Sequence, residues 1–224
     1  MNNIKTFDNF NSKDIFKYIG NDDIESVKNY INCGYDLNIK NDDGDTALIY
    51  STKYNNVEVV KLLLNSGANI DKLSNLDNTA LMHAAYENCI EIAKLLLDAG
   101  ADVDKLGQYY FTALILAAYK NHIEIVKLLL KAGADMDKQN EDGDTALIYA
   151  ASNNNREMVE LLLDYGADEF ILNNNDKSFY DYLNDENKEY FTQNYPTSVY
   201  NAIYHEYKKP FTEFVKDYNV KNNI

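Results

Sequence analysis

The chain has 224 residues, of which 46% are hydrophobic and 25% are charged, the balance of a folded protein and not of a disordered one. Its formal net charge is −15 at pH 7, which argues against nucleic acid or an anionic membrane surface as a partner, because both bind clustered Lys and Arg. Only two cysteines occur, and the chain has neither a secretory signal nor an apolar run of about 18 residues, so we expect a cytoplasmic protein that does not span a membrane.

From the N-terminus, residues 1–12 carry no repeated pattern and form an N-terminal segment. After them the sequence repeats with a fixed period of 33 residues. Residues 13–45 are a degenerate first repeat, which we expect to cap the N-terminal end. Glycines mark the same position of successive units, namely Gly34, Gly67, Gly100, Gly133 and Gly166.

Four full units follow, at residues 46–78, 79–111, 112–144 and 145–177. Each begins with Thr-Ala-Leu, whose threonine hydroxyl can cap a short apolar helix. An asparagine suited to a left-handed turn comes next, then a second helix with a broad apolar face, and then the glycine that ends it. The capping threonines are Thr46, Thr79, Thr112 and Thr145, and the turn asparagines are Asn55, Asn88, Asn121 and Asn154.

The motifs TALMHAA at residues 79–85 and GADVD at residues 100–104 resemble the signature of the ankyrin repeat family. The resemblance covers about residues 13–177 and implies an all-α repeat solenoid, an ankyrin-repeat stack of helix–turn–helix units with β-turn fingers. Two positions depart from the family pattern: alanine replaces its proline, and an aliphatic residue replaces its histidine, as in Ala80 and Met82. Both changes are compatible with the fold, since Ala favours helix and an aliphatic side chain adds apolar contact.

After the repeats, residues 178–193 are predicted to form a degenerate C-terminal cap repeat, with its outer face in solvent. Residues 194–224 are predicted to form extra C-terminal amphipathic helices that open at Pro196 and Pro210. These helices either cap the stack or dock on a partner. The second case leaves open an alternative function, an adaptor or regulatory subunit that recruits a second protein through its C-terminal helices.

Catalytic and metal-binding patterns are missing from the sequence. The three histidines stand apart from any nucleophile or phosphate-binding motif, and structural roles are predicted for His83 and His122. The Asp-rich turns at 41–45 and 140–144 fail the ligand spacing of a calcium loop. We therefore expect no enzyme, no cofactor and no metal, although an enzyme with an unrecognised site in the tail is a further alternative.

The resemblance implies a non-catalytic protein–protein interaction scaffold that binds a protein or peptide partner on its concave, finger-side surface. We expect a monomer whose partner has basic character. Residues at the finger tips and at the exposed ends of the first helices are the predicted contacts: Asp43, Asp45, Leu76, Tyr109, Phe111, Asp142 and Asp144 in fingers, and Tyr54, Tyr86 and Tyr119 at helix ends. Tyr109, Tyr110 and Phe111 stand where other fingers read DGD or LDN, although the 19 tyrosines also fit a general compositional preference.

Overall fold

The computed structural model describes residues 11–195, which divide into two compact units. The first unit contains residues 11–117 and 124–134, and the second contains residues 118–123 and 135–195. The amphipathic helices predicted from Pro196 and Pro210 lie outside the described residues, as does most of the N-terminal segment.

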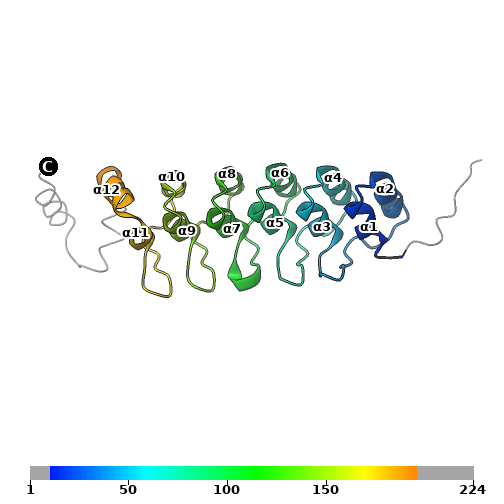
Figure 1. The fold of residues 1–224 in the computed structure, drawn as a ribbon, viewed down its shortest axis with the longest axis horizontal. Helices are drawn as coiled ribbons and strands as arrows, with labels where there is room; N and C mark the ends of the chain where they lie inside the picture. The colour runs from blue at the N-terminus through cyan, green and yellow to red at the C-terminus, as the bar shows by residue number, and fades with distance from the viewer. Residues whose placement is uncertain (1–10, 196–224) are drawn as a thin grey trace, which may run out of the picture. The chain divides into compact units, whose positions relative to one another are not determined.

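The helices of the first unit lie in two rows (Figure 1). One row holds the first helices of successive hairpins, α1 (Asp14–Gly20), α3 (Ala47–Lys53) and α5 (Ala80–Tyr86), and the other holds α2 (Ile24–Asn32), α4 (Val57–Asn65) and α6 (Ile90–Asp98). Neighbours pack along each row, and α1 packs on α2, α3 on α4 and α5 on α6. A 3-10 turn, η1 (Gln108–Tyr110), precedes α7 (Ala113–Tyr119) and α8 (Ile123–Lys131), whose residues are divided between the units.

The second unit continues the hairpin pattern with α9 (Ala146–Ser152) and α10 (Arg156–Asp164). A shorter hairpin follows, made of α11 (Phe179–Tyr182) and α12 (Asp185–Asn194). Helix α9 packs against both α10 and α11. No β-strand occurs among residues 11–195, which contain one isolated bridge, between Lys40 and Thr46.

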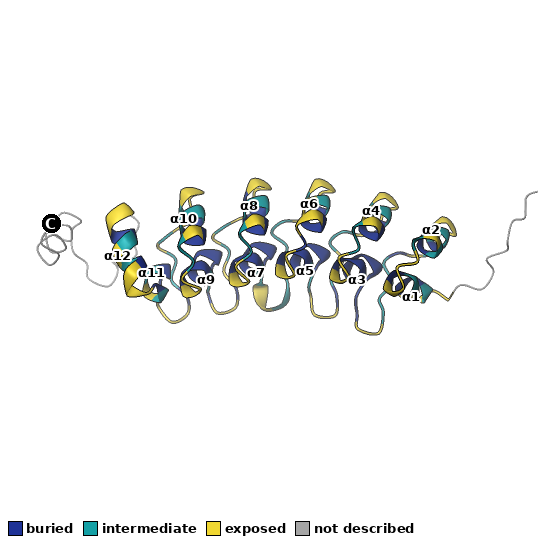
Figure 2. Cartoon of the chain, turned by 45° about the horizontal axis from the view of Figure 1, so that its top comes forward, coloured by how far each residue is buried: buried dark blue, intermediate teal, exposed yellow. Residues whose placement is uncertain are grey.

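The core lies between the helices of each hairpin and between neighbouring hairpins. Figure 2 shows buried residues on the facing sides of α3 and α4 and of α5 and α6. The first helices bury small residues such as Ala84 and Ala85, which let neighbouring helices approach closely, beside larger ones such as Leu81. Second helices contribute larger side chains, and the fully buried leucines at one register position are Leu63, Leu96, Leu129 and Leu162.

The predicted helix caps and turns are confirmed. Threonine hydroxyls accept hydrogen bonds from the amides three residues later, with distances of 3.3 Å for Thr46, 3.2 Å for Thr79 and Thr112, and 3.3 Å for Thr145. All four turn asparagines have positive φ, between 51° and 66°. The five glycines that follow second helices also lie in the left-handed region, where the absence of a Cβ removes the steric cost.

Replacing Thr79 with Ala is expected to lower the free energy of unfolding by about 1 kcal/mol, a typical value for a lost N-cap. Thr79 is buried, so its loss leaves the Met82 amide without the hydroxyl acceptor and without water. Urea unfolding followed by circular dichroism measures the change. Thr79→Ser keeps the hydroxyl and should stay close to the wild type; equal stability of the Ala and Ser variants would contradict the capping role.

Candidate partner-binding surface

The fingers are loops between hairpins, each closed by a repeated backbone hydrogen bond. In the first unit the amides of Asn41, Ser74 and Gly107 donate to the carbonyl oxygens four residues later, at 2.9, 2.9 and 2.8 Å. In two of these loops the first side chain also holds the turn. The Asn41 Oδ1 accepts from the Asp45 amide at 2.8 Å, and the Ser74 Oγ accepts from the Asn78 amide at 3.2 Å. The third finger cannot do this, because it begins with glycine.

The third finger, residues 107–111, is called the aromatic finger below. Tyr109 and Tyr110 have φ of 53° and 60°, so two bulky residues in succession adopt the left-handed conformation. Such a conformation costs on the order of 1–2 kcal/mol for each residue that is not glycine. The positions equivalent to Tyr110 in other fingers are Gly44, Asp77, Gly143 and Asp176, residue types that tolerate positive φ better.

The aromatic finger presents its tyrosines to solvent. Tyr109 is 60% exposed and Tyr110 is 58% exposed, while Phe111 is only partly exposed. Gly107 allows the finger to lie against its neighbour, since a Cβ there would be 2.7 Å from the Met82 Sδ and 3.0 Å from the Asp77 carbonyl oxygen. Tyr110 was not among the predicted contact residues. The sequence signal that could have identified Tyr110 is an aromatic side chain at a repeat position that holds Gly or Asp in the other fingers.

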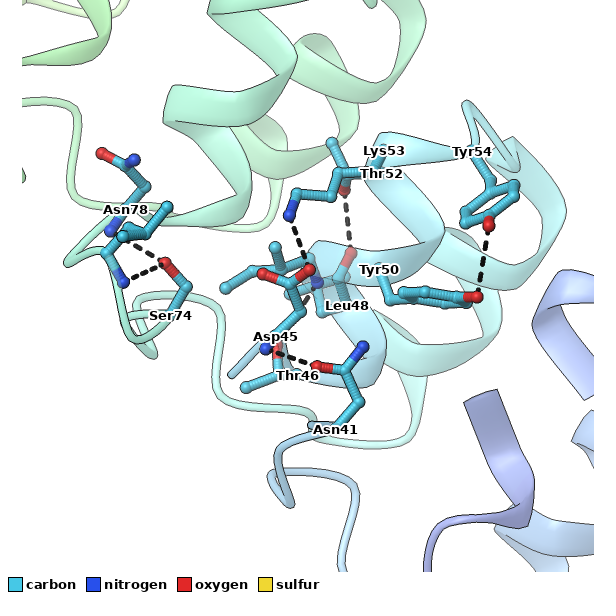
Figure 3. A network of polar contacts seen from close by, with 12 residues as sticks. Asn41, Asp45, Thr46, Leu48, Tyr50, Thr52, Lys53, Tyr54, Ser74 and Asn78 are labelled. Atoms are coloured by element: carbon cyan, nitrogen blue, oxygen red, sulfur yellow. Dashed lines mark hydrogen bonds and ion pairs between the residues drawn. The ribbon is translucent and has the colours of Figure 1, made fainter. Parts of the chain in front are cut away.

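Asp45 differs from the exposed fingertip residue that the sequence predicts. Its side chain is 4% exposed, and its carboxylate accepts from the Lys53 Nζ at 2.6 Å (Figure 3). Burial is possible because Lys53, at the end of α3, supplies the opposite charge. Asp45 therefore supports the finger from within, whereas Asp43 at the tip is exposed.

His83 on α5 belongs to the same region of the first unit. Its Nε2 is buried and has no hydrogen-bond partner among the described residues. Burial, together with the positive charge of Lys53, lowers the pKa of His83 to about 4, while the negative charge of Asp45 opposes the shift. The sequence missed this arrangement, because Asp45, Lys53 and His83 come from different parts of two hairpins.

The tyrosines predicted at helix ends of the first unit are both exposed. Tyr54 is held in an aromatic cluster: its ring centroid is 4.7 Å from that of Tyr50, and the Tyr50 hydroxyl donates to the Tyr54 hydroxyl at 3.3 Å. Phe16 also packs edge to face on Tyr50, at a centroid distance of 5.6 Å. Tyr54 is therefore both exposed and packed against another side chain of the fold. Tyr86 lies at the C-terminal end of α5.

In the second unit, Tyr119 is exposed and its ring packs edge to face on Tyr149, at a centroid distance of 5.5 Å. Asn153 donates from Nδ2 to the Tyr119 carbonyl oxygen at 3.0 Å, and Tyr119, Lys120, Asn121 and Asn153 line a shallow pocket. Among the predicted acidic contacts, Asp142 is exposed. Asp144 is half-buried, which raises the pKa of its carboxyl, and it accepts from the Asn173 Nδ2 at 2.7 Å.

The family assignment follows from comparison with known proteins. A family model described as ankyrin repeats (3 copies) matches residues 15–107 and again residues 105–174. These matches cover well over half of the chain. The chain belongs to the ankyrin repeat family. No curated protein matches it.

Ankyrin repeats are generally protein–protein interaction modules, and they are typically non-catalytic. None of the helices within residues 11–195 has both the length and the apolar character needed to cross a membrane. In the same part of the chain, His, Cys, Asp and Glu side chains nowhere gather in threes that could hold a metal ion.

Many acidic residues of the ankyrin repeats serve the stack. In the first unit the Asp71 Oδ1 accepts from the Asp102 amide of the next repeat at 3.0 Å, and in the second unit Asp137 accepts from the Asp168 amide at 2.8 Å. Asn38 does the same for the Asn69 amide. These contacts join consecutive repeats, two through the carboxylates of Asp71 and Asp137 and one through the side-chain amide of Asn38. The acidic residues at the fingertips are therefore a smaller group than the net charge suggests.

Proposed function

We propose that the protein is a non-catalytic scaffold in the cytoplasm that binds a protein partner through the fingers and helix ends of its ankyrin repeats. One observation carries the proposal: Leu76, Tyr109 and Tyr110 are large apolar side chains, each more than half exposed, on adjacent fingers of one unit. The repeated residues are explained by capping, turns and stacking. Leu76, Tyr109 and Tyr110 have none of these structural roles. Exposed aromatic residues are favoured in binding hot spots.

Charge supports the same surface. Residues 1–177 carry −13 of the formal net charge, since residues 178–224 contain seven acidic and five basic side chains. Such a field attracts a partner of basic character and increases its rate of association. Tyr86 in the first unit, and Tyr119 and Asp142 in the second, are further proposed contacts because each is exposed in its own unit.

The double variant Tyr109→Ser/Phe111→Ser is expected to weaken partner binding at least about ten-fold, because truncating aromatic hot-spot residues removes most of their apolar contact. Pull-down from cell extract with mass spectrometry identifies the partner, and titration of the purified partner gives the affinity. Tyr165→Ser is the matched control, since Tyr165 is an exposed tyrosine at the end of a second helix. Undiminished binding by the double variant would contradict the proposal.

A further inference from the structure

We propose that the fingertips of the first unit form a composite site for a peptide segment of the partner that carries a bulky apolar side chain next to Lys or Arg. The tip site consists of Asp43, Leu76, Asp77, Tyr109 and Tyr110. This inference rests on the proposed function and goes further, because it names the chemistry of the partner and the residues that select it.

Each finger of the first unit contacts its neighbour: the first and second fingers meet near their tips, and the base of the third finger lies against the second. The Asn75 amide donates to the Gly44 carbonyl oxygen at 3.2 Å, and the Lys40 Nζ donates to the Asn75 Oδ1 at 3.2 Å. On the other side, Gly107 lies so close to Asp77 and Asn78 that a Cβ would be within 3.0 Å of both. Leu76 and Asp77 therefore lie on the finger next to the aromatic finger, and Asp43 lies on the finger beyond it.

The tip site combines apolar area with two exposed carboxylates that form no ion pair in the described part of the chain. Leu76 is 57% exposed, close to the values for Tyr109 and Tyr110. Asp43 and Asp77 are exposed and form no ion pair within residues 11–195, whereas neighbouring Asp42 pairs with Lys13. A segment that places a bulky apolar side chain between the tyrosines and Leu76, with Lys or Arg beside it, satisfies both features.

The conformation of the aromatic finger indicates that its tyrosines serve binding. Gly107 removes the side-chain acceptor that holds the other fingers, and Tyr109 and Tyr110 occupy left-handed positions. The Tyr110 amide donates within the finger to the Gly107 carbonyl oxygen at 3.1 Å, but the side chains of Tyr109 and Tyr110 are exposed and make no hydrogen bond or ring contact with the described residues. Backbone strain without compensating contacts in the free protein is typical of functional sites, where the bound partner supplies the contacts.

The test uses a phage-displayed library of random 12-residue peptides, selected on the full chain. We expect enrichment of peptides with Lys or Arg beside Leu, Ile or Phe, and weaker binding as salt is raised. Tyr110→Asn should reduce their affinity at least about ten-fold while raising the melting temperature by about 2 °C, because Asn tolerates positive φ and the strain is relieved.

A second pair of variants isolates the charge. Asp77→Asn, which keeps a side chain that tolerates positive φ, should weaken the salt dependence of peptide binding. Asp98→Asn is the matched control, because Asp98 is exposed at the end of α6. Failure to enrich any peptide, or enriched peptides that bind wild type and Tyr110→Asn equally, would overturn the inference. The proposed function has a separate test: it is contradicted if the partner found by pull-down binds the Tyr109→Ser/Phe111→Ser variant as tightly as the wild type.

Discussion

Replacing Lys53 with Met is expected to lower the free energy of unfolding by about 2 kcal/mol. The substitution keeps the aliphatic stem and removes the ammonium group that pairs with Asp45 at 2.6 Å. Asp45 is then left as a buried carboxylate without its counter-charge, and breaking a buried pair costs roughly 3–5 kcal/mol. The smaller value is expected here because the Lys53 side chain is 36% exposed and water screens part of the interaction.

Urea unfolding at pH 7, followed by circular dichroism, measures this loss for Lys53→Met. The double variant Lys53→Met/Asp45→Asn should recover at least half of it, because an amide needs no counter-charge and Asn78 occupies the equivalent position of the next repeat. Lys61→Met is the matched control: it breaks the exposed pair with Glu91 and should cost about 0.5 kcal/mol or less. Equal losses for Lys53→Met and Lys61→Met would show that burial of Asp45 has no energetic consequence.

The sequence predicted those parts of the fold that depend on short-range rules. A threonine before an apolar helix, an asparagine between helices and a glycine after them each satisfy a local backbone requirement, and Thr79, Asn88 and Gly100 occupy those positions in the structure. The exposure of Leu76, Tyr109 and Tyr119 was also anticipated, because the repeat period separates constant from variable positions. Their role in binding stays a prediction.

The environment of the acidic residues could not be predicted in the same way. Asp45 and Asp144 close the same Asp-Gly-Asp turn in two repeats, yet Asp45 pairs with Lys53 and is buried, while Asp144 accepts from Asn173 and is half-buried. The difference comes from residues outside the turn: Ser152 stands where Lys53 would be. The conformation of the aromatic finger could not be predicted from the sequence either, because tyrosine disfavours the positive φ that Tyr109 and Tyr110 adopt.

The second large effect is a dependence of stability on pH that comes from His83. Its pKa is about 4 in the folded protein, against an unperturbed value near 6.5. From about pH 7.5 upward, one unit above the unperturbed pKa, the imidazole is essentially neutral in both states and contributes almost no pH dependence. Between pH 6.5 and 4 the unfolded chain binds a proton that the folded protein does not, so stability falls as pH falls, and the loss is complete below about pH 4.

Replacing His83 with Leu should remove this loss, which we expect to reach about 2–3 kcal/mol after allowance for partial exposure. Leu116 occupies the same position one repeat later, so an aliphatic side chain fits the site. Urea midpoints of the wild type and of His83→Leu, measured from pH 7.5 to 4, give a difference curve in which the carboxylates common to both proteins largely cancel. The difference should be smallest at about pH 7.5, begin to grow as pH falls through 6.5, and widen in favour of His83→Leu toward pH 4. A constant difference across the whole range would mean that His83 is protonated as readily in the folded protein as in the unfolded chain.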